Sequence, residues 1–212
     1  TDSNITFNGT VRSDSAGTPR DLTINLDANN TGSTTADVII NGIVGGASLP
    51  LDVITITGDL DLNSSIGNSP GATSITVSGD ANLGADVETT GTQTYSGAVI
   101  LSADVTLTTT DSNITFGSTV DGDGTARDLT IDMDNSGVSA DGTVQFANTV
   151  GANNSLDVID ITGNLNLDAA ISNTTSLEVS GTSNLGADVT TSSTQTYSGA
   201  VVLSNDVTLT TT

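Results

Sequence analysis

The chain has 212 residues and a net charge of −22, with 25 acidic residues, three arginines and no lysine, histidine, cysteine or tryptophan. So few cations exclude a surface that binds nucleic acid or an anionic membrane, and the missing cysteines exclude disulfides and thiolate metal sites. The sequence has no run of about 18 apolar residues, so we expect no segment that inserts into a membrane.

The hydrophobic fraction, 34%, is low for a compact globule. The apolar residues are mainly Val, Ile, Leu and Ala among Gly, Ser, Thr, Asn and Asp, a mixture that favours strands and turns over helices. A chain this polar and acidic could also be disordered. Its apolar residues recur at regular positions, however, and this regularity favours a folded structure.

Short stretches of alternating apolar and polar residues, mostly followed by glycine, predict strands with one buried face. In chain order they are ITFNGTV from Ile5, DLTINLD from Asp21, VIINGIV from Val38, ITITGDL from Ile54, ITVSGDA from Ile75 and QTYSGAV from Gln93, then VQFANTV from Val144, IDITGNL from Ile159, LEVSGTS from Leu177 and QTYSGAV from Gln195. The glycines at 42, 58, 79 and 97 are 16, 21 and 18 residues apart and predict bends in the chain.

The chain consists of two copies of one long unit, placed at residues 1–110 and 111–212 of one continuous rod. The repeated phrases are DSNITF at Asp2–Phe7 and Asp111–Phe116, RDLTI at Arg20–Ile24 and Arg127–Ile131, LDVI at Leu51–Ile54 and Leu156–Ile159, NLGADV at Asn82–Val87 and Asn184–Val189, and TQTYSGAV at Thr92–Val99 and Thr194–Val201. The offset between copies decreases along the chain, which small deletions in loops explain.

Because no helix-length pattern separates the strands and hairpin signals are few, we expect an all-β parallel β-helix, a β-solenoid of roughly 10–12 coils without a globular cap. An antiparallel sandwich of short strands is the alternative. The aromatic residues two places before the glycine position should point inward and form a column. These residues are Phe7, Tyr95, Phe116, Phe146 and Tyr197.

The two ends of the chain occupy the same phase of the repeat. VTLTTT at Val207–Thr212 would continue into the N-terminal DSNITF, as the same phrases do at Thr110–Asp111. Open solenoid ends normally carry polar caps, and none is visible here. We therefore expect the partner to be the protein itself, by covalent continuation of a longer array or by head-to-tail stacking, with the coil of VTLTTT pairing with the coil of DSNITF.

The stretch from Thr92 to Phe116, TQTYSGAVILSADVTLTTTDSNITF, resembles the repeat regions of very large bacterial surface proteins. These are the filamentous-haemagglutinin-like adhesins and related β-strand-repeat proteins. The resemblance covers nearly the whole chain, twice. It implies a right-handed parallel β-helix, secretion to the cell surface and a role as a stalk or adhesive fibre. It carries no catalytic residue to transfer and identifies no ligand.

Carboxylates are the remaining candidates for catalysis, since Ser–His and Cys–His pairs are excluded. The densest group, GDLDLN at Gly58–Asn63, becomes GNLNLD at Gly163–Asp168 in the second copy. Acid and amide therefore exchange freely, as on a solvated strand face. We predict no catalytic residues and no enzyme, with a polysaccharide-active β-helix as the alternative.

Asp121 and Asp123, in the phrase DGDG, are the candidate calcium ligands. The phrase lacks the further ligands of an EF-hand and the spacing of a calcium-binding β-roll, so an acidic turn is the simpler interpretation and we expect no cofactor. Aspartate also recurs before valine, where we expect it to stack at one corner and to accept backbone N–H bonds rather than to bind a column of cations. These residues are Asp37, Asp52, Asp86, Asp104, Asp157, Asp188 and Asp206.

Outward threonines could form the flat ranks of an ice-binding solenoid, but the outward residue varies among Thr, Asn, Ser, Asp and Gln, which argues against such a face. The sequence therefore predicts a structural segment of an extracellular, cell-surface fibre or adhesin stalk, built by stacked coils and kept soluble by negative charge. The alternative is a directly adhesive surface that binds a receptor or glycan.

Overall fold

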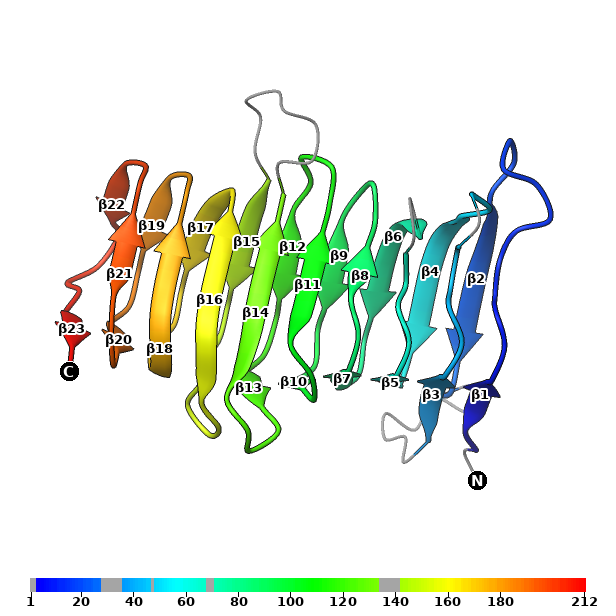
Figure 1. Cartoon of the computed structure of the whole chain (residues 1–212), viewed down its shortest axis with the longest axis horizontal. Coiled ribbons are helices and arrows are strands. Elements are labelled where there is room, and N and C mark those ends of the chain that lie inside the picture. Colours follow the sequence, from blue (N-terminus) through cyan, green and yellow to red (C-terminus); the bar gives the residue numbers. More distant parts are fainter. Residues whose placement is uncertain (1–2, 28–35, 47, 68–70, 134–141) are drawn as a thin grey trace.

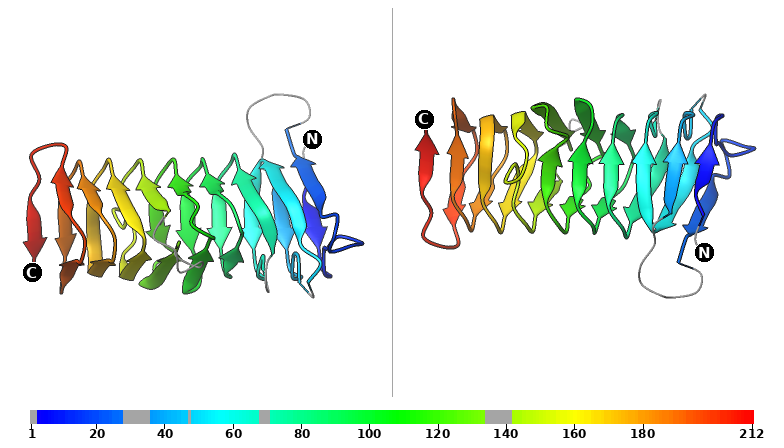
Figure 2. Two further views of the ribbon diagram at one scale, coloured as in Figure 1. Left: turned by 90° about the horizontal axis from the view of Figure 1, so that it is seen from above. Right: turned by 90° about the horizontal axis from the view of Figure 1, so that it is seen from below.

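The computed structural model describes residues 3–27, 36–46, 48–67, 71–133 and 142–212, so Asp2 of the first DSNITF phrase lies outside it. In these residues all the regular secondary structure is β-strand and every strand pairing is parallel. The chain winds into a β-solenoid, a rod with the N-terminal and C-terminal coils at opposite ends (Figures 1 and 2). The predicted all-β parallel solenoid is confirmed.

The rod has three faces, here named A, B and C, and each turn of the chain crosses them in the order A, C, B. Face A holds β1 (Ile5–Phe7), β3 (Asp37–Ile40), β5 (Asp59–Leu62), β7 (Ala81–Leu83), β10 (Val99–Leu101) and β13 (Val120–Gly122), and continues through Val150 and Ile171 to β20 (Val189–Thr191) and β23 (Leu209–Thr211).

Face B is the nine-stranded sheet. It consists of β2 (Arg20–Asn25), β4 (Leu51–Thr57), β6 (Ala72–Val77), β9 (Gln93–Tyr95), β12 (Ile114–Phe116), β15 (Thr143–Phe146), β17 (Asn164–Leu167), β19 (Ser183–Leu185) and β22 (Val201–Leu203).

Face C begins with single-residue bridges at Val11, Val44 and Ile66 and continues through β8 (Val87–Glu88), β11 (Val105–Thr108), β14 (Arg127–Asp132), β16 (Leu156–Thr162), β18 (Ile171–Val179) and β21 (Gln195–Tyr197). Strand β18 crosses a corner, so that Ile171 pairs with β20 on face A and its last residues pair with β21 on face C.

Strand alternation creates the core. In β4, Ile54 and Ile56 are buried while Thr55 and Thr57 lie on the outside. The parallel pairing places each inward residue against its equivalent in the next coil, so that Ile56 is followed by Val77. A thin tube filled by such columns needs few apolar residues per coil, which explains the low hydrophobic fraction.

Glycine marks the corner that follows several of these strands. Gly58 has φ +127°, a conformation that L side chains rarely adopt. A Cβ on Gly97 would overlap the backbone of Gly79 in the preceding coil. Backbones of successive coils therefore approach too closely at this corner for a side chain.

The number of coils predicted from the sequence was too high. The nine strands of face B are separated by eight turns, fewer than the expected 10–12 coils. The sequence stretches that were counted as coils lie on more than one face, because VIINGIV forms β3 on face A and ITITGDL forms β4 on face B of the same coil. Gly42 and Gly58 are therefore separated by only part of a turn.

The second long copy is rotated by one face relative to the first. From Ile5 the chain returns to face A four times, at β3, β5, β7 and β10, then crosses face C at β11 and reaches Ile114 on face B. One long repeat thus takes four turns and two further faces, which is one face short of five full turns. Equivalent residues of the two copies therefore lie one face apart. Accordingly, DSNITF forms β1 on face A and β12 on face B, and RDLTI begins β2 on face B and β14 on face C.

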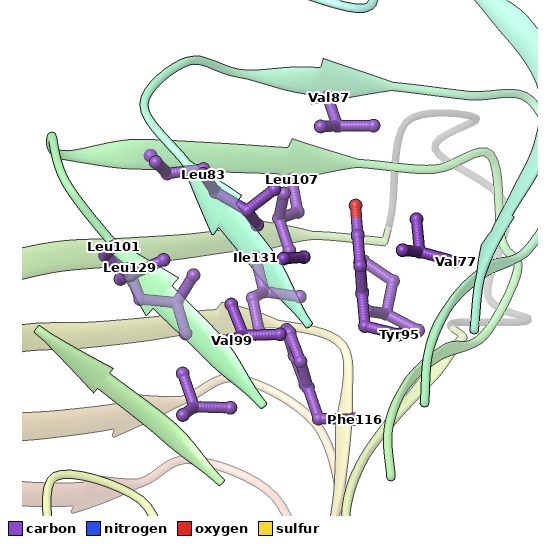
Figure 3. Packing of buried hydrophobic residues seen from close by; sticks show 14 of the residues in the cluster. Val77, Leu83, Val87, Tyr95, Val99, Leu101, Leu107, Phe116, Leu129 and Ile131 are labelled. Atoms are coloured by element: carbon purple, nitrogen blue, oxygen red, sulfur yellow. The ribbon is translucent and has the colours of Figure 1, made fainter. Parts of the chain in front are cut away.

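This rotation divides the expected aromatic column. Tyr95, Phe116 and Phe146 do stack on face B, with ring centroids 5.6 Å and 5.2 Å apart and interplanar angles of 15° and 8°. Figure 3 shows Tyr95 and Phe116 inside the rod among aliphatic side chains. Phe7 and Tyr197, however, lie half-buried on faces A and C. The prediction of a single column of all five was wrong, because equivalent residues of the two copies occupy different faces.

Candidate functional site: the repeat junction

The junction between the two copies is a continuous parallel ladder. Strand β12 of the second copy lies on β9 of the first, with Ile114 paired to Gln93 and Phe116 paired to Tyr95. The Gln93 N–H donates to the Asn113 carbonyl at 3.2 Å, and the Gly117 N–H donates to the Tyr95 carbonyl at 2.8 Å.

The coil that ends with VTLT pairs with the coil that DSNITF begins, through β9 on β12, β10 on β13 and β11 on β14. VTLT forms β11, which pairs with β8 and β14. DSNITF forms β12, which pairs with β9 of the preceding coil and with β15 of the following coil. The two phrases themselves are consecutive in the chain and lie on neighbouring faces, so VTLT and DSNITF form no ladder with each other.

A buried glutamine holds the coils together beside the junction. The Gln93 Nε2 donates to the carbonyls of Val87 at 3.1 Å and Thr108 at 3.0 Å, and lies 3.3 Å from the hydroxyl of Thr89. Its Oε1 accepts the Tyr95 hydroxyl at 3.1 Å. Because Thr108 belongs to the next coil, this amide links two coils while satisfying its own hydrogen bonds inside the core.

The second copy repeats this network. The Gln195 Nε2 donates to the carbonyls of Val189 at 3.1 Å and Thr210 at 2.8 Å, and the Tyr197 hydroxyl donates to the Gln195 Oε1 at 3.2 Å. Burial raises the pKa of Tyr197 to about 12 and raises the pKa of Tyr95 further. Sequence reasoning missed this role of glutamine, although the verbatim repetition of TQTYSGAV was a signal for it.

The last coil exposes the side chains that the junction buries. Val201, Leu203 and Leu209 are 43%, 59% and 49% exposed. Their equivalents in the first copy, which lie under the second copy, are fully buried: Val99, Leu101 and Leu107. In the first coil, Ile5 is 38% exposed.

Three of the aspartates before valine accept backbone N–H groups of the following coil. The Asp86 Oδ1 accepts the Thr106 N–H at 2.8 Å, and the Asp188 Oδ1 accepts the Thr208 N–H at 2.7 Å. Asp104 accepts the N–H of Asp128 in the same way, at 3.2 Å. The expected N–H acceptance is confirmed for these three aspartates.

The expectation that all such aspartates stack at one corner was wrong. Asp86 precedes β8 on face C, whereas Asp188 precedes β20 on face A, so the rotation of the copies separates them. Asp52 and Asp157 lie within strands β4 and β16 rather than at a corner before a strand.

The carboxylates of both candidate calcium ligands accept hydrogen bonds from other groups of the protein. Asp121 is buried, and its Oδ1 accepts the N–H groups of Asn153 at 2.9 Å and Asn154 at 3.3 Å. Its Oδ2 accepts the Asn153 Nδ2 at 2.9 Å. This carboxylate therefore fixes the turn that precedes β16. In the described part of the chain, no group of three acidic side chains could hold a metal ion.

Asp123 forms an ion pair with Arg127 at 2.9 Å and accepts the Thr125 N–H at 3.0 Å. The hydrogen bond from Arg127 lowers the pKa of Asp123 to about 2. The first copy has the equivalent pair between Asp14 and Arg20 at 3.0 Å. The structure thus shows Asp123 repeating a local ion pair rather than converging with Asp121.

The acidic group GDLDLN lines a shallow groove on face A, and Asn164 and Asn166 of its counterpart GNLNLD line a groove on face B. The first groove contains Asp37, Asp59, Asp61 and Asp80, and the second contains Thr143, Asn164, Asn166 and Thr182. The Asp59 Oδ1 accepts the Asp80 N–H at 2.8 Å, and the Asn164 Oδ1 accepts the Thr182 N–H at 2.8 Å. Acid and amide therefore have the same structural role in the two copies.

The outward threonines are more regular than the sequence suggested. Five of them are in register on successive strands of face B: Thr23, Thr55, Thr76, Thr94 and Thr115. The rank ends at Gln145 in the next coil. The sequence could not reveal this rank because its members are separated by unequal numbers of residues.

No protein-family model, curated protein or solved structure matches this chain. Within the described residues, no helix is long and apolar enough to cross a membrane.

Proposed function

We propose that this chain is a structural segment of a repetitive extracellular fibre or adhesin stalk, assembled by stacking of β-coils. The observation that best supports this proposal is the junction between the two copies. Parallel pairing and aromatic stacking pass from Tyr95 in the first copy to Phe116 in the second without interruption. A repeat joined in this way can be extended unit by unit, and its main-chain ladders then run along the whole rod.

The charge supports a spacer role for the rod. A net charge of −22 with no lysine makes parallel rods repel one another and stay soluble, and salt screens this repulsion. We propose no catalytic role, because Asp59 is engaged in holding a backbone N–H and the second copy does the same with an amide.

Direct adhesion is the second candidate, and the threonine rank on face B favours it. Five outward hydroxyl side chains spaced by one coil, about 4.8 Å, form a polar strip that could contact a glycan or receptor. Replacing Thr55, Thr76 and Thr94 by valine should abolish binding to a glycan array if this candidate is right and leave coil stacking intact.

Surface labelling of the source cells tests the main proposal. Antibody raised against the purified chain should label intact cells, and gold particles in thin sections should lie at a distance from the outer surface. Antibody against a cytoplasmic marker is the control for cell integrity. Labelling that appears only after permeabilisation would contradict an extracellular fibre.

A further inference from the structure

We propose that a second copy of this chain, stacked as proposed above, lies on the coil of Tyr197 rotated about the rod axis by one face, so that its Phe7 stacks on Tyr197. This inference rests on the assembly by coil stacking proposed above. It specifies which strands meet and how successive copies are oriented.

The order of the faces sets the rotation. At the internal junction β11 lies on face C, and the DSNITF strand that follows it, β12, lies one face further, on face B. The last strand, β23, lies on face A, so the next segment falls on face C. The exposed strand on face C is β21, which carries Gln195 and Tyr197. The β1 strand of the incoming copy therefore pairs with β21.

The internal junction supplies the contacts of this interface. Phe7 would lie on Tyr197 as Phe116 lies on Tyr95. The second strand to be covered is β22, where Val11 of the incoming copy would lie on Val201 as Val120 lies on Val99.

The third covered strand is β23. Ile24 of the incoming copy would lie on Leu209 as Ile131 lies on Leu107. The three pairings thus cover the apolar side chains of the last coil that the junction buries in the first copy. These pairings repeat the register that the internal junction shows.

A join without rotation fits less well. It would place β1 on face A against β23, with Thr6 beside Thr210, and would leave β21 and β22 uncovered. Tyr197, Val201 and Leu203 would then remain exposed to water. The rotated join leaves no such gap, and it makes a head-to-tail contact that does not close into a ring.

Paired cysteine variants distinguish the two joins, because the chain has no cysteine of its own. Thr94 and Thr115 are Cα partners at the junction, and Thr6 and Thr196 would be the equivalent partners across the rotated join. Neighbouring strands are about 4.8 Å apart, within the range that a disulfide spans. Variant T94C/T115C is the positive control and should close within one chain.

We expect mild oxidation at high salt to convert T6C/T196C into a ladder of dimers, trimers and longer species on a non-reducing gel. Variant T6C/T210C, which reports the unrotated join, should stay mostly monomeric. A ladder from T6C/T210C that equals or exceeds that from T6C/T196C would overturn the rotation and leave the fibre proposal standing. If neither variant forms a ladder while the control closes, copies of this chain do not stack, whatever the surface labelling shows.

Discussion

Tyr95 and Phe116 belong to different long repeats, yet their rings stack in the core with centroids 5.6 Å apart and planes inclined by 15°. The contact occurs because the second copy begins on face B, whereas the first copy begins on face A, so that Phe116 continues the column of Tyr95. The same phrase in the last coil places Tyr197 on face C, where it is only partly buried. Equivalent residues of the two copies therefore contribute differently to the free energy of unfolding.

Replacing Tyr95 by alanine should destabilise the protein by about 3–5 kcal/mol, because it removes a fully buried aromatic ring from a stacked column. Tyr197→Ala should cost less, since its ring is only half-buried. Urea unfolding of both variants measures the difference. Equal losses would show that the two tyrosines occupy equivalent environments.

Gln93→Ala should cost about 1–3 kcal/mol, because it leaves the buried Tyr95 hydroxyl and the carbonyls of Val87 and Thr108 without their partner. Gln145→Ala is the matched control, because that amide points outward and donates to the Asp168 carboxylate at 2.8 Å. Thermal unfolding of the two variants should separate them clearly. If the control is as unstable as Gln93→Ala, the buried amide has no special role.

Asp59→Asn should leave the free energy of unfolding nearly unchanged, because the amide oxygen can accept the Asp80 N–H as Asn164 accepts that of Thr182. Asp59→Ala removes the acceptor and should cost about 1 kcal/mol. Chemical denaturation of both variants tests this order. A large loss for Asp59→Asn would mean that the charge itself is required.

Alkaline pH should weaken the fold. The folded pKa of Tyr197 is raised to about 12 by burial, above the value near 10 of an unfolded tyrosine. The resulting stabilisation is complete below about pH 10 and is lost as the pH rises through about 12. Tyrosinate absorbance of Tyr95→Phe should show one late titration step, from Tyr197. A step near pH 10 in the folded protein would contradict this.

Much of the fold could be predicted from the sequence. Alternation as in ITITG and corner glycines such as Gly97 indicated parallel coils, because inward residues and tight corners follow directly from strand geometry. The number of turns could not be predicted, since face C begins with single-residue bridges at Val11, Val44 and Ile66 that leave no strand pattern. Without those segments the one-face rotation of the copies remains hidden.

The roles of individual side chains were harder to predict. The sequence pointed to Asp121 through the phrase DGDG, but its partner Asn153 lies 32 residues away and is brought close only by the coil. The networks of Gln93 and Gln195 likewise join residues of successive coils. Such contacts depend on the register between coils, which varies with the length of each loop.

Cryo-electron microscopy of filaments formed by the purified 212-residue chain at high salt tests the solenoid assembly most directly. Two long repeats take nine turns and one further face, so each copy should add a rise of about 45 Å at a coil spacing of about 4.8 Å, with a rotation near one third of a turn. A filament with this rise and rotation, and with Phe7 stacked on Tyr197 at each join, is the predicted result. Single rods that do not associate, or filaments whose copies follow one another without rotation, would contradict it.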